Sequence, residues 1–273
     1  MSIPKIIHYC WFGGNPLPED AVQYIQSWRK YCPDYKIIEW NETNFDLDSV
    51  PYVKEAHETK KWAFITDYVR LYALNEMGGI YMDTDVEVLK NFDVFLDNEG
   101  FSGFERADAI PTGIMAAEKG NPFIKELLRE YDGLHFCRSD GTLDLTTNVT
   151  RITNCALKHG LELNNCKQKF WHFTVYPKDY FCPKDYVTGE IVLTENTYTI
   201  HHFSGSWHSP RQKKWQSFEK NIAKKIGNGK MVALRKTFAW RGIGVIYTKG
   251  WGYCLKRLKK MDLKGNAKHE ISG

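Results

Sequence analysis

Compact apolar runs alternate with amphipathic segments along most of this 273-residue chain. Residues 5–12 are largely apolar and are closed by two glycines, so they predict a first buried strand and its loop. Ala21, Tyr24, Ile25 and Trp28 follow at positions i, i+3, i+4 and i+7, which is the apolar stripe of a helix. Residues 36–40 have the pattern of a second strand. Strand, helix and strand at this spacing predict a βαβ unit.

The same alternation continues through the middle of the chain. Residues 62–76 carry an apolar helical face that ends at Gly78 and Gly79, and an apolar strand follows at once. Further strands are predicted at 86–89, 100–104, 114–117, 171–176 and 198–202, and further helices at 122–131 and 146–161. The pattern predicts an α/β fold with a single Rossmann-like mixed sheet flanked by helices. Such sheets bind ligands at their carboxyl edge.

Charge is concentrated near the C-terminus. Residues 211–268 hold seventeen Lys and Arg against Glu219 and Asp262, a local balance of +15 in a chain whose net charge is +4. We therefore predict a catalytic domain over 1–210 and a basic helical segment over 211–273. Aromatic and aliphatic residues interleave with the basic ones, which suits an interfacial helix on anionic lipid, with a helical cap packed on the core as the alternative. No nucleic-acid-binding motif is present.

Seven cysteines without a C-x-x-C pair indicate reduced thiols rather than a disulfide or zinc framework. Residues 1–5 lead directly into the first strand pattern, with no secretory leader, and no window reaches about 20 consecutive apolar residues. We expect a cytoplasmic protein held peripherally on the inner face of the cytoplasmic membrane.

Two carboxylates emerge where the strand after Gly79 ends. In Gly-Gly-Ile-Tyr-Met-Asp-Thr-Asp, residues 78–85, alternate side chains of an extended segment share a face, so Asp83 and Asp85 point the same way. Hard oxygen ligands suit Mg²⁺ or Mn²⁺ that also holds a diphosphate. Asp46 and Asp48 have the same spacing but no buried strand before them.

Three other positions are candidates for the same site. Asp67 and Arg70 form an i, i+3 pair on the helix that feeds the carboxylate strand, where they could bind sugar hydroxyls or phosphate. His201 and His202 end a late strand, and since neighbours in a strand face opposite ways, only one is expected at the site. Trp11 follows the first strand and could stack a nucleobase.

The motifs at 3–14, 63–70, 78–85 and 201–202 with 206–207 occur in the order of a known family. Over residues 3–210 the chain resembles glycosyltransferase family 32, the Asp-x-Asp sugar-binding-region enzymes. That family includes yeast initiating mannosyltransferases, vertebrate α-1,4-galactosyltransferases and bacterial capsular and surface polysaccharide enzymes. The resemblance implies a GT-A fold, a nucleotide-sugar donor, Mn²⁺ or Mg²⁺, and retention of anomeric configuration.

Site roles follow from the resemblance, residue by residue. It implies that Asp67 and Arg70 contact the donor sugar, that Asp83 lies against ribose or sugar, and that Asp85 binds the metal directly with His202 as the second ligand. It further implies a donor-binding set. These residues are Trp11, which stacks the base, Tyr81, Asn148, which faces the reacting sugar, and Ser206 and Trp207 at the diphosphate.

The implied reaction moves a hexose of galactose, N-acetylgalactosamine or glucose type from a UDP-sugar to an oligosaccharide or polyprenyl-diphosphate-linked acceptor. A GDP-mannose donor is the alternative, and a non-catalytic membrane-surface adaptor is the alternative of another class. No carboxylate is an obvious nucleophile, so we favour front-face attack, with Glu105 and Asp108 as the alternatives.

Overall fold

The computed structural model describes residues 2–106, 108–205 and 209–249, and its contacts divide the chain into two compact units. The first unit is Met1–Lys184 with Ile191–Ser204, and the second is Asp185–Glu190 with Gly205–Gly273. The sequence pattern places the division at 210/211 and does not reveal that residues 185–190 belong with the C-terminal unit. Each unit is described separately.

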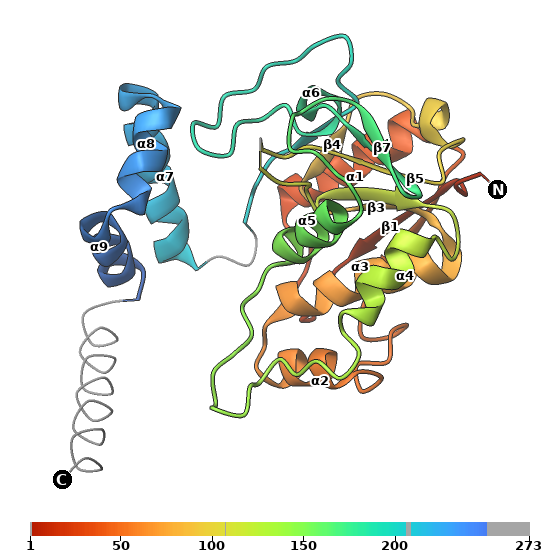
Figure 1. The fold of residues 1–273 in the computed structure, drawn as a ribbon, viewed down its shortest axis with the longest axis horizontal. Helices are drawn as coiled ribbons and strands as arrows, with labels where there is room; N and C mark the ends of the chain where they lie inside the picture. Colours follow the sequence, from red (N-terminus) through yellow and green to blue (C-terminus); the bar gives the residue numbers. More distant parts are fainter. Residues whose placement is uncertain (1, 107, 206–208, 250–273) are drawn as a thin grey trace. The chain divides into compact units, whose positions relative to one another are not determined.

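The first unit is a mixed sheet covered by helices on both faces (Figure 1). Its elements are β1 (Ile6–Cys10), α1 (Glu19–Tyr31), β2 (Lys36–Trp40), α2 (Pro51–Glu58), α3 (Trp62–Met77), β3 (Gly79–Met82), β4 (Val86–Val88), the 3₁₀ turn η1 (Asp93–Phe95), β5 (Gly100–Gly103), β6 (Ile114–Ala117), α4 (Pro122–Arg129), α5 (Asn148–Lys158), β7 (Gln168–Phe170), β8 (Phe173–Tyr176), α6 (Lys178–Phe181) and β9 (Thr199–His201). The predicted fold class, one mixed α/β sheet flanked by helices, is confirmed.

The main sheet has seven strands in the order β2-β1-β3-β6-β5-β8-β7, and β4 pairs with β9 in a separate two-stranded sheet. Strand β1 lies parallel to both β2 and β3, whereas β6 runs antiparallel to β3 and β5. The predicted βαβ unit is therefore present, and the carboxyl ends of β1 and β3 lie at the same edge of the sheet.

Alternate residues of β3 enter two separate hydrophobic cores. Ile80 and Met82 pack with α1 residues such as Trp28, and Tyr81 packs on the opposite face with residues of α2, α3 and α4. This alternation is the strand period expected from the sequence. Since β3 is buried on both faces, the residue that follows it is fixed in position at the edge of the sheet.

Two glycines make the connection from α3 to β3 possible. Gly78 ends the helix with φ of 66°, and Gly79 has φ of 112°, both in the region that favours glycine. A Cβ at Gly78 would lie 2.7 Å from the backbone nitrogen of Lys119, and one at Gly79 would lie 2.7 Å from the carbonyl oxygen of Ile6. The close approach of α3 to the sheet thus depends on both glycines.

A buried histidine closes the same junction. His8 is fully buried; its Nε2 lies 2.8 Å from the carbonyl oxygen of Gly78, and its Nδ1 accepts a hydrogen bond from Trp40 Nε1 at 3.1 Å. These partners require the neutral ring with the proton on Nε2. Burial lowers the pKa of His8 to about 4.

This depressed pKa predicts acid sensitivity of the fold. Below pH 6.5 the unfolded chain binds a proton at His8 that the folded chain does not bind until about pH 4, so stability falls as the pH falls through this window. We expect the free energy of unfolding to be about 2 kcal/mol lower at pH 5 than at pH 7 from this group. Urea titrations of His8→Gln should show a flatter pH dependence, and the same substitution at partly exposed His57 is the control. An equal slope in His8→Gln would contradict the assignment.

The second unit consists of α7 (Pro210–Ile226), α8 (Asn228–Lys236) and α9 (Phe238–Lys249), which confirms helix for the described part of the basic segment. Ala223, Met231 and Val187 form its small core. Ser209 and Gln212 form a capping box at the start of α7, and Gly227, with φ of 85°, ends that helix. Among the described residues, no helix has the length and apolar character needed to span a bilayer.

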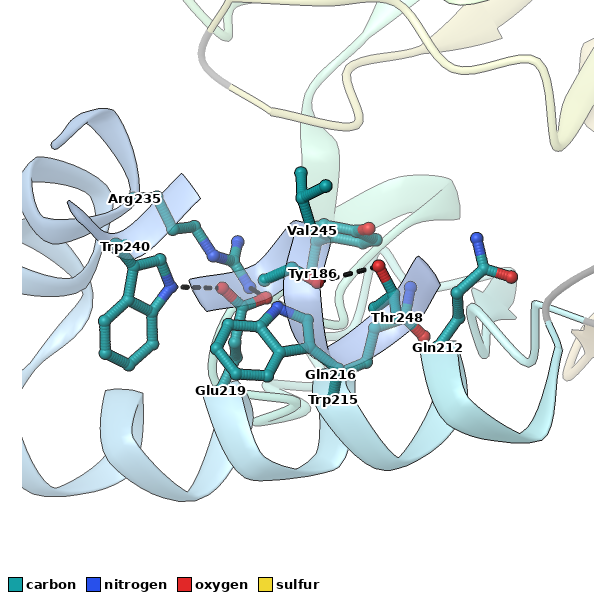
Figure 2. A pocket seen from close by; sticks show the side chains of 10 residues that line it. Tyr186, Gln212, Trp215, Gln216, Glu219, Arg235, Trp240, Val245 and Thr248 are labelled. Carbon is teal, nitrogen blue, oxygen red and sulfur yellow. Dashed lines mark hydrogen bonds and ion pairs between the residues drawn. The ribbon is translucent and has the colours of Figure 1, made fainter. Parts of the chain in front are cut away.

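A pocket of about 520 Å³ lies within the second unit (Figure 2). Trp215 and Trp240 line it with their rings 5.4 Å apart. Glu219, 8% exposed, accepts hydrogen bonds from Trp240 Nε1 at 2.6 Å and from Arg235 at 3.1 Å. These contacts pair the carboxylate of Glu219 with a cation and an indole, so it is part of the packing between α7, α8 and α9.

Candidate active site

The two carboxylates lie where β3 ends and β4 begins. The backbone N–H of Asp83 donates to the carbonyl oxygen of Gly113 at 2.9 Å, and a turn closes between Asp83 and Val86. Asp85 directly precedes β4, whose residue Val86 is paired with His201 of β9. One ligand atom from each of Asp83, Asp85 and His201 lies within 4.8 Å of the other two. The predicted convergence of Asp83 and Asp85 is present, and a histidine completes it.

That histidine is His201, which corrects the preference for His202. His201 Nε2 lies 3.2 Å from Asp85 Oδ1. His202 Nε2 instead lies 2.8 Å from Glu87 Oε2, and its ring stacks on Tyr24 of α1 at 4.5 Å. Adjacent residues do face opposite ways, as expected, but the packing of α1 against β4 decides which one faces Asp85.

The surroundings hold His201 and Asp85 in place. A Cβ at position 113 would come within 2.6 Å of His201 Nδ1, so Gly113 leaves the space that the imidazole needs. Asp85 Oδ2 accepts the backbone N–H of Ser204 at 2.7 Å. Burial alone would raise the pKa of Asp85, but the facing His201 and the Ser204 N–H outweigh it and hold the pKa below its usual value.

Arg70 of α3 contacts both Asp67 on the same helix and Asp83 at the end of β3. Its side chain is 5% exposed, and its guanidinium lies 3.2 Å from Asp67 Oδ1 and 3.4 Å from Asp83 Oδ1. It also donates to the carbonyl oxygens of Thr66 and Thr112 at 3.1 and 2.7 Å. The predicted approach of Asp67 and Arg70 to Asp83 is therefore present. Because the guanidinium is buried and engaged with these partners, Arg70 holds both carboxylates in position, and its contact with a donor sugar stays a prediction.

Asp67 is partly enclosed, with a side chain 14% exposed. Burial and, to a lesser extent, the charge of Asp83 raise its pKa to about 6, against the opposing effect of Arg70. Asn148, the first residue of α5, is 2% exposed, and its Nδ2 donates to the carbonyl oxygen of Asp67 at 3.0 Å. The N-terminus of α5 is thus attached to α3 beside the carboxylates, and the buried amide of Asn148 holds the backbone of Asp67.

Tyr81 also has a different role from the one expected. Its side chain is 1% exposed, so it does not line an open donor site. Its hydroxyl donates to Asp83 Oδ1 at 2.9 Å, and Arg70 lies over its ring at 4.6 Å. Tyr81 therefore orients the Asp83 carboxylate through this hydrogen bond. The signal for this role is the strand period, which places residue 81 on the face opposite Ile80 and Met82.

The remaining predicted donor residues are less constrained. Trp11 follows β1, at the same sheet edge as Asp83; it is partly exposed, and its Nε1 donates to the carbonyl oxygen of Asn15 at 2.6 Å. Ser206 and Trp207 lie outside the described residues, so their roles stay predictions.

The second Asp-x-Asp pattern is a turn. Asp46 Oδ1 accepts the backbone N–H of Asp48 at 3.0 Å, and Asp48, with a side chain 74% exposed, pairs with Lys54. These are local capping contacts. The buried strand before Asp83 is therefore the feature that distinguishes the two patterns.

Two further carboxylates differ sharply in position. Asp108 is on the surface, with a side chain 74% exposed and paired with Arg106. Glu105 is 8% exposed, and its pKa is raised by burial and by the charge of Asp83, while His201 opposes the shift. Of the two, Glu105 is the one near the carboxylate cluster.

The residues present fit a divalent cation. Two carboxylates and one imidazole within 4.8 Å of one another offer the oxygen-rich, partly nitrogen donor set that Mn²⁺ accepts and Mg²⁺ accepts less readily. Asp85 and His201 would hold the ion, with Asp83 beside them.

The two histidines give a direct test of this assignment. We expect His201→Ala to weaken Mn²⁺ binding by about 10–100-fold, because it removes a nitrogen ligand and the partner of Asp85. His202→Ala is the matched control and should change the affinity by no more than about twofold, since it removes only a contact with Glu87 and Tyr24. Isothermal titration calorimetry measures both. A larger loss in His202→Ala would reinstate His202 as the ligand.

Comparison with known proteins places the two carboxylates of this cluster in a described sequence region. Residues 18–102 match the family model "Glycosyltransferase sugar-binding region containing DXD motif". That range includes Asp67, Arg70, Asp83 and Asp85.

Curated relatives match about half of the chain. Inositol phosphoceramide mannosyltransferase 3 of Schizosaccharomyces pombe is 29% identical over 132 residues, which cover 47% of this chain and 37% of the relative. Mannosyl phosphorylinositol ceramide synthase SUR1 of Saccharomyces cerevisiae is 28% identical over 145 residues, which cover 49% of this chain and 37% of the relative. The chain thus spans little more than a third of the length of these relatives.

A solved structure titled PaToxG Glycosyltransferase is 20% identical, with a TM-score of 0.47, and the superposition covers 57% of this chain and 70% of that one. The family model and the named relatives therefore support a glycosyltransferase, with residues 18–102 as its Asp-x-Asp sugar-binding region.

Proposed function

We propose that this protein transfers a hexose from a nucleotide sugar to a hydroxyl group of a glycan acceptor, with Mn²⁺ or Mg²⁺ bound by Asp85 and His201. The observation that carries the proposal is the convergence of Asp83, Asp85 and His201 within 4.8 Å at the end of β3. Both carboxylates of this cluster lie inside the matched sugar-binding region. An adaptor would not need this set of carboxylates and its buried support.

Each residue has a defined task in this proposal. A bound divalent cation would offset the negative charge that grows on the departing diphosphate. Arg70 holds Asp67 and Asp83 in fixed positions, and Tyr81 fixes the rotamer of Asp83. Gly113 and the Ser204 N–H fix His201 and Asp85. A donor would therefore meet groups that need no reorganisation, which is the main source of electrostatic catalysis.

For stereochemistry we propose retention, with attack of the acceptor hydroxyl from the leaving-group face. Glu105 is the alternative nucleophile, because it is buried near Asp83 and His201. Glu105→Ala distinguishes the two. Front-face attack predicts that azide does not restore turnover in this variant, whereas a covalent mechanism predicts rescue with formation of a glycosyl azide of inverted configuration.

Two donor classes are proposed. The sequence resemblance favours a UDP-hexose of galactose, N-acetylgalactosamine or glucose type. The names of the curated relatives are those of mannosyltransferases, and they favour the mannose alternative, with GDP-mannose as the donor.

A panel of UDP- and GDP-sugars with Mn²⁺, read by release of the nucleotide, tests both donors and the adaptor alternative. Metal-dependent release from one donor, lost on addition of a chelator, is expected. Lack of turnover with any donor, together with tight acceptor or lipid binding, would favour the adaptor.

For the acceptor we propose a glycan carried by a lipid, reached at an anionic membrane surface. The relatives are named for lipid substrates, inositol phosphoceramides. The second unit combines exposed apolar side chains, including Phe218 and Tyr247 at 48% and 47%, with exposed basic residues on α7 and α8. This composition fits an interfacial surface on anionic lipid. The location we propose is the inner face of the cytoplasmic membrane.

Charge reversal tests the membrane proposal in the full chain. The triple variant Lys213→Glu, Lys214→Glu and Lys224→Glu should lose flotation with phosphatidylcholine vesicles that contain phosphatidylglycerol. Exposed lysines of the first unit, Lys60, Lys61 and Lys125, changed in the same way, are the control and should leave binding intact. Equal vesicle binding by the two variants would show that the basic residues of the second unit do not mediate lipid binding.

A further inference from the structure

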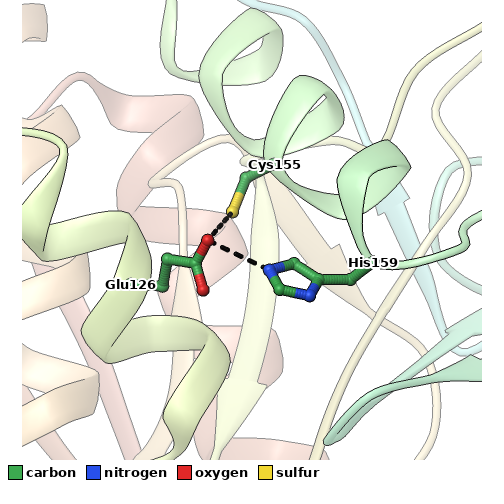
Figure 3. A group of neighbouring side chains, drawn as sticks. All are labelled: Glu126, Cys155 and His159. Atoms are coloured by element: carbon green, nitrogen blue, oxygen red, sulfur yellow. Dashed lines mark hydrogen bonds and ion pairs between the residues drawn. The ribbon is translucent and has the colours of Figure 1, made fainter.

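A cysteine, a histidine and a glutamate converge at a second place in the first unit, away from the Asp83 cluster. Cys155 and His159 lie four residues apart at the end of α5, and Glu126 faces them from α4 (Figure 3). One ligand atom from each lies within 4.8 Å of the other two. Because residues i and i+4 of a helix share a face, the thiol and the imidazole point to the same side.

One oxygen is the common partner. Glu126 Oε1 lies 3.7 Å from Cys155 Sγ and 3.0 Å from His159 Nε2 (Figure 3). Ligands on a tetrahedral zinc ion, with bonds of about 2.0–2.3 Å, lie about 3.3–3.8 Å apart, so these separations are close to those of two edges of such a site.

The buried thiol distinguishes this cluster from the ordinary ion pairs of the chain. His135 with Glu55 and His172 with Glu99 also form close pairs, at 2.6 and 2.9 Å, and neither pair is part of a three-ligand group. Cys155, in contrast, is fully buried and points at the carboxylate.

The imidazole is also held in position. The ring of Trp171 stacks on His159 at 4.1 Å with an interplanar angle of 15°. Trp171 has φ of 41°, a backbone conformation that an indole-bearing residue rarely adopts. A residue strained in this way covers one face of the imidazole and leaves its Nε2 directed at Glu126. The geometry is thus fixed by packing rather than by the hydrogen bond alone.

We propose that Glu126, Cys155 and His159 bind a Zn²⁺ ion that links α4 to α5. Thiolate, imidazole and carboxylate are the ligands zinc accepts, and a thiolate is a poor ligand for the Mn²⁺ or Mg²⁺ expected at the Asp83 cluster. On binding, the thiol releases its proton to solvent, and the two negative ligands balance the charge of the ion. The fourth position is open to water or an external ligand.

The role of this metal is structural. Helix α5 starts at Asn148, whose side chain holds the backbone of Asp67, and the proposed zinc fixes the other end of the same helix to α4. Zinc would therefore stabilise the position of α5. The zinc proposal can be tested independently of the proposed glycosyl transfer, because it involves other residues and is measured by metal binding rather than by turnover.

Cobalt absorption tests the site in the full chain. After removal of metal by a chelator and dialysis into a phosphine reductant, Co²⁺ should produce a saturable near-ultraviolet sulfur-to-cobalt charge-transfer band, and Zn²⁺ should abolish it. Cys155→Ser should lose the band. The same substitution at Cys166, which is exposed, and at Cys182, which neighbours His201, should retain it.

Two more variants keep the test decisive if Cys155→Ser does not fold. Glu126→Gln and His159→Gln retain the thiol, and each should weaken Co²⁺ binding by about 10–100-fold. Zinc should raise the midpoint of thermal unfolding of the wild-type chain more than that of either variant. A band that persists in Cys155→Ser, no band at excess Co²⁺, or equal affinity in all variants would overturn the proposal.

Discussion

Replacing Asp85 with alanine is expected to abolish metal-dependent release of nucleotide from the donor, with a loss of about a thousandfold or more. The Asp85 carboxylate contacts both the histidine of the site and the backbone that follows β9. Its Oδ1 faces His201 at 3.2 Å, and its Oδ2 accepts the Ser204 N–H at 2.7 Å. Its removal therefore deletes the proposed metal ligand and also releases the histidine and the segment after β9.

The chain contains a matched control for this substitution. Asp48→Ala removes the second carboxylate of the other Asp-x-Asp pattern, whose side chain is 74% exposed and pairs with Lys54. It should leave turnover within about twofold and stability within about 0.5 kcal/mol. Steady-state nucleotide release at a series of Mn²⁺ concentrations measures both variants. Near-normal, metal-dependent turnover in Asp85→Ala would contradict the proposed metal site.

Much of the first unit follows from local pattern. The helix over 62–76, the strand after Gly79 and the two carboxylates at its end are all present, because each depends on signals within a few residues. The helix α2 was not predicted, although α4 has the same length and was. The buried residues of α2 are Tyr52, Val53 and Ala56, which form a weaker apolar stripe than the Phe123, Ile124 and Leu127 of α4. Residues 185–190 join the second unit through tertiary contacts that no local pattern encodes.

The parts of the site that were missed depend on contacts between distant segments. Whether His201 or His202 faces Asp85 is decided by the pairing of β4 with β9 and by Tyr24 of α1. No local pattern shows that Arg70 also donates to the carbonyl oxygen of Thr112, far along the chain. A sequence supplies the candidate ligands, and the packing of nonadjacent elements selects among them.

The second large effect is expected at Arg70. Arg70→Ala should destabilise the fold by about 3–5 kcal/mol, because it leaves two carboxylates that are only 14% and 26% exposed without their shared cation. Turnover should fall by about a hundredfold or more, since neither carboxylate is then held in place. Arg70→Lys keeps the charge but loses the planar fork and the stacking on Tyr81, so it should restore only part of either property.

The pH dependence of stability separates this role from simple loss of packing. The pKa of Asp67 is already raised to about 6, so its contribution to stability is present in acid and is lost as the pH rises through 6. Without Arg70 the pKa of Asp67 should rise further, and Arg70→Ala should therefore be more destabilised at pH 7.5 than at pH 5. Adding Asp67→Asn to Arg70→Ala removes the titrating carboxyl group. The double variant should therefore recover part of the stability at pH 7.5, and its free energy of unfolding should no longer depend on whether the pH is 5 or 7.5 through this group. Urea titrations at pH 5 and pH 7.5 measure the free energy of unfolding of each variant. If Arg70→Ala were destabilised equally at both pH values, Arg70 would stabilise the fold through packing rather than through its charge.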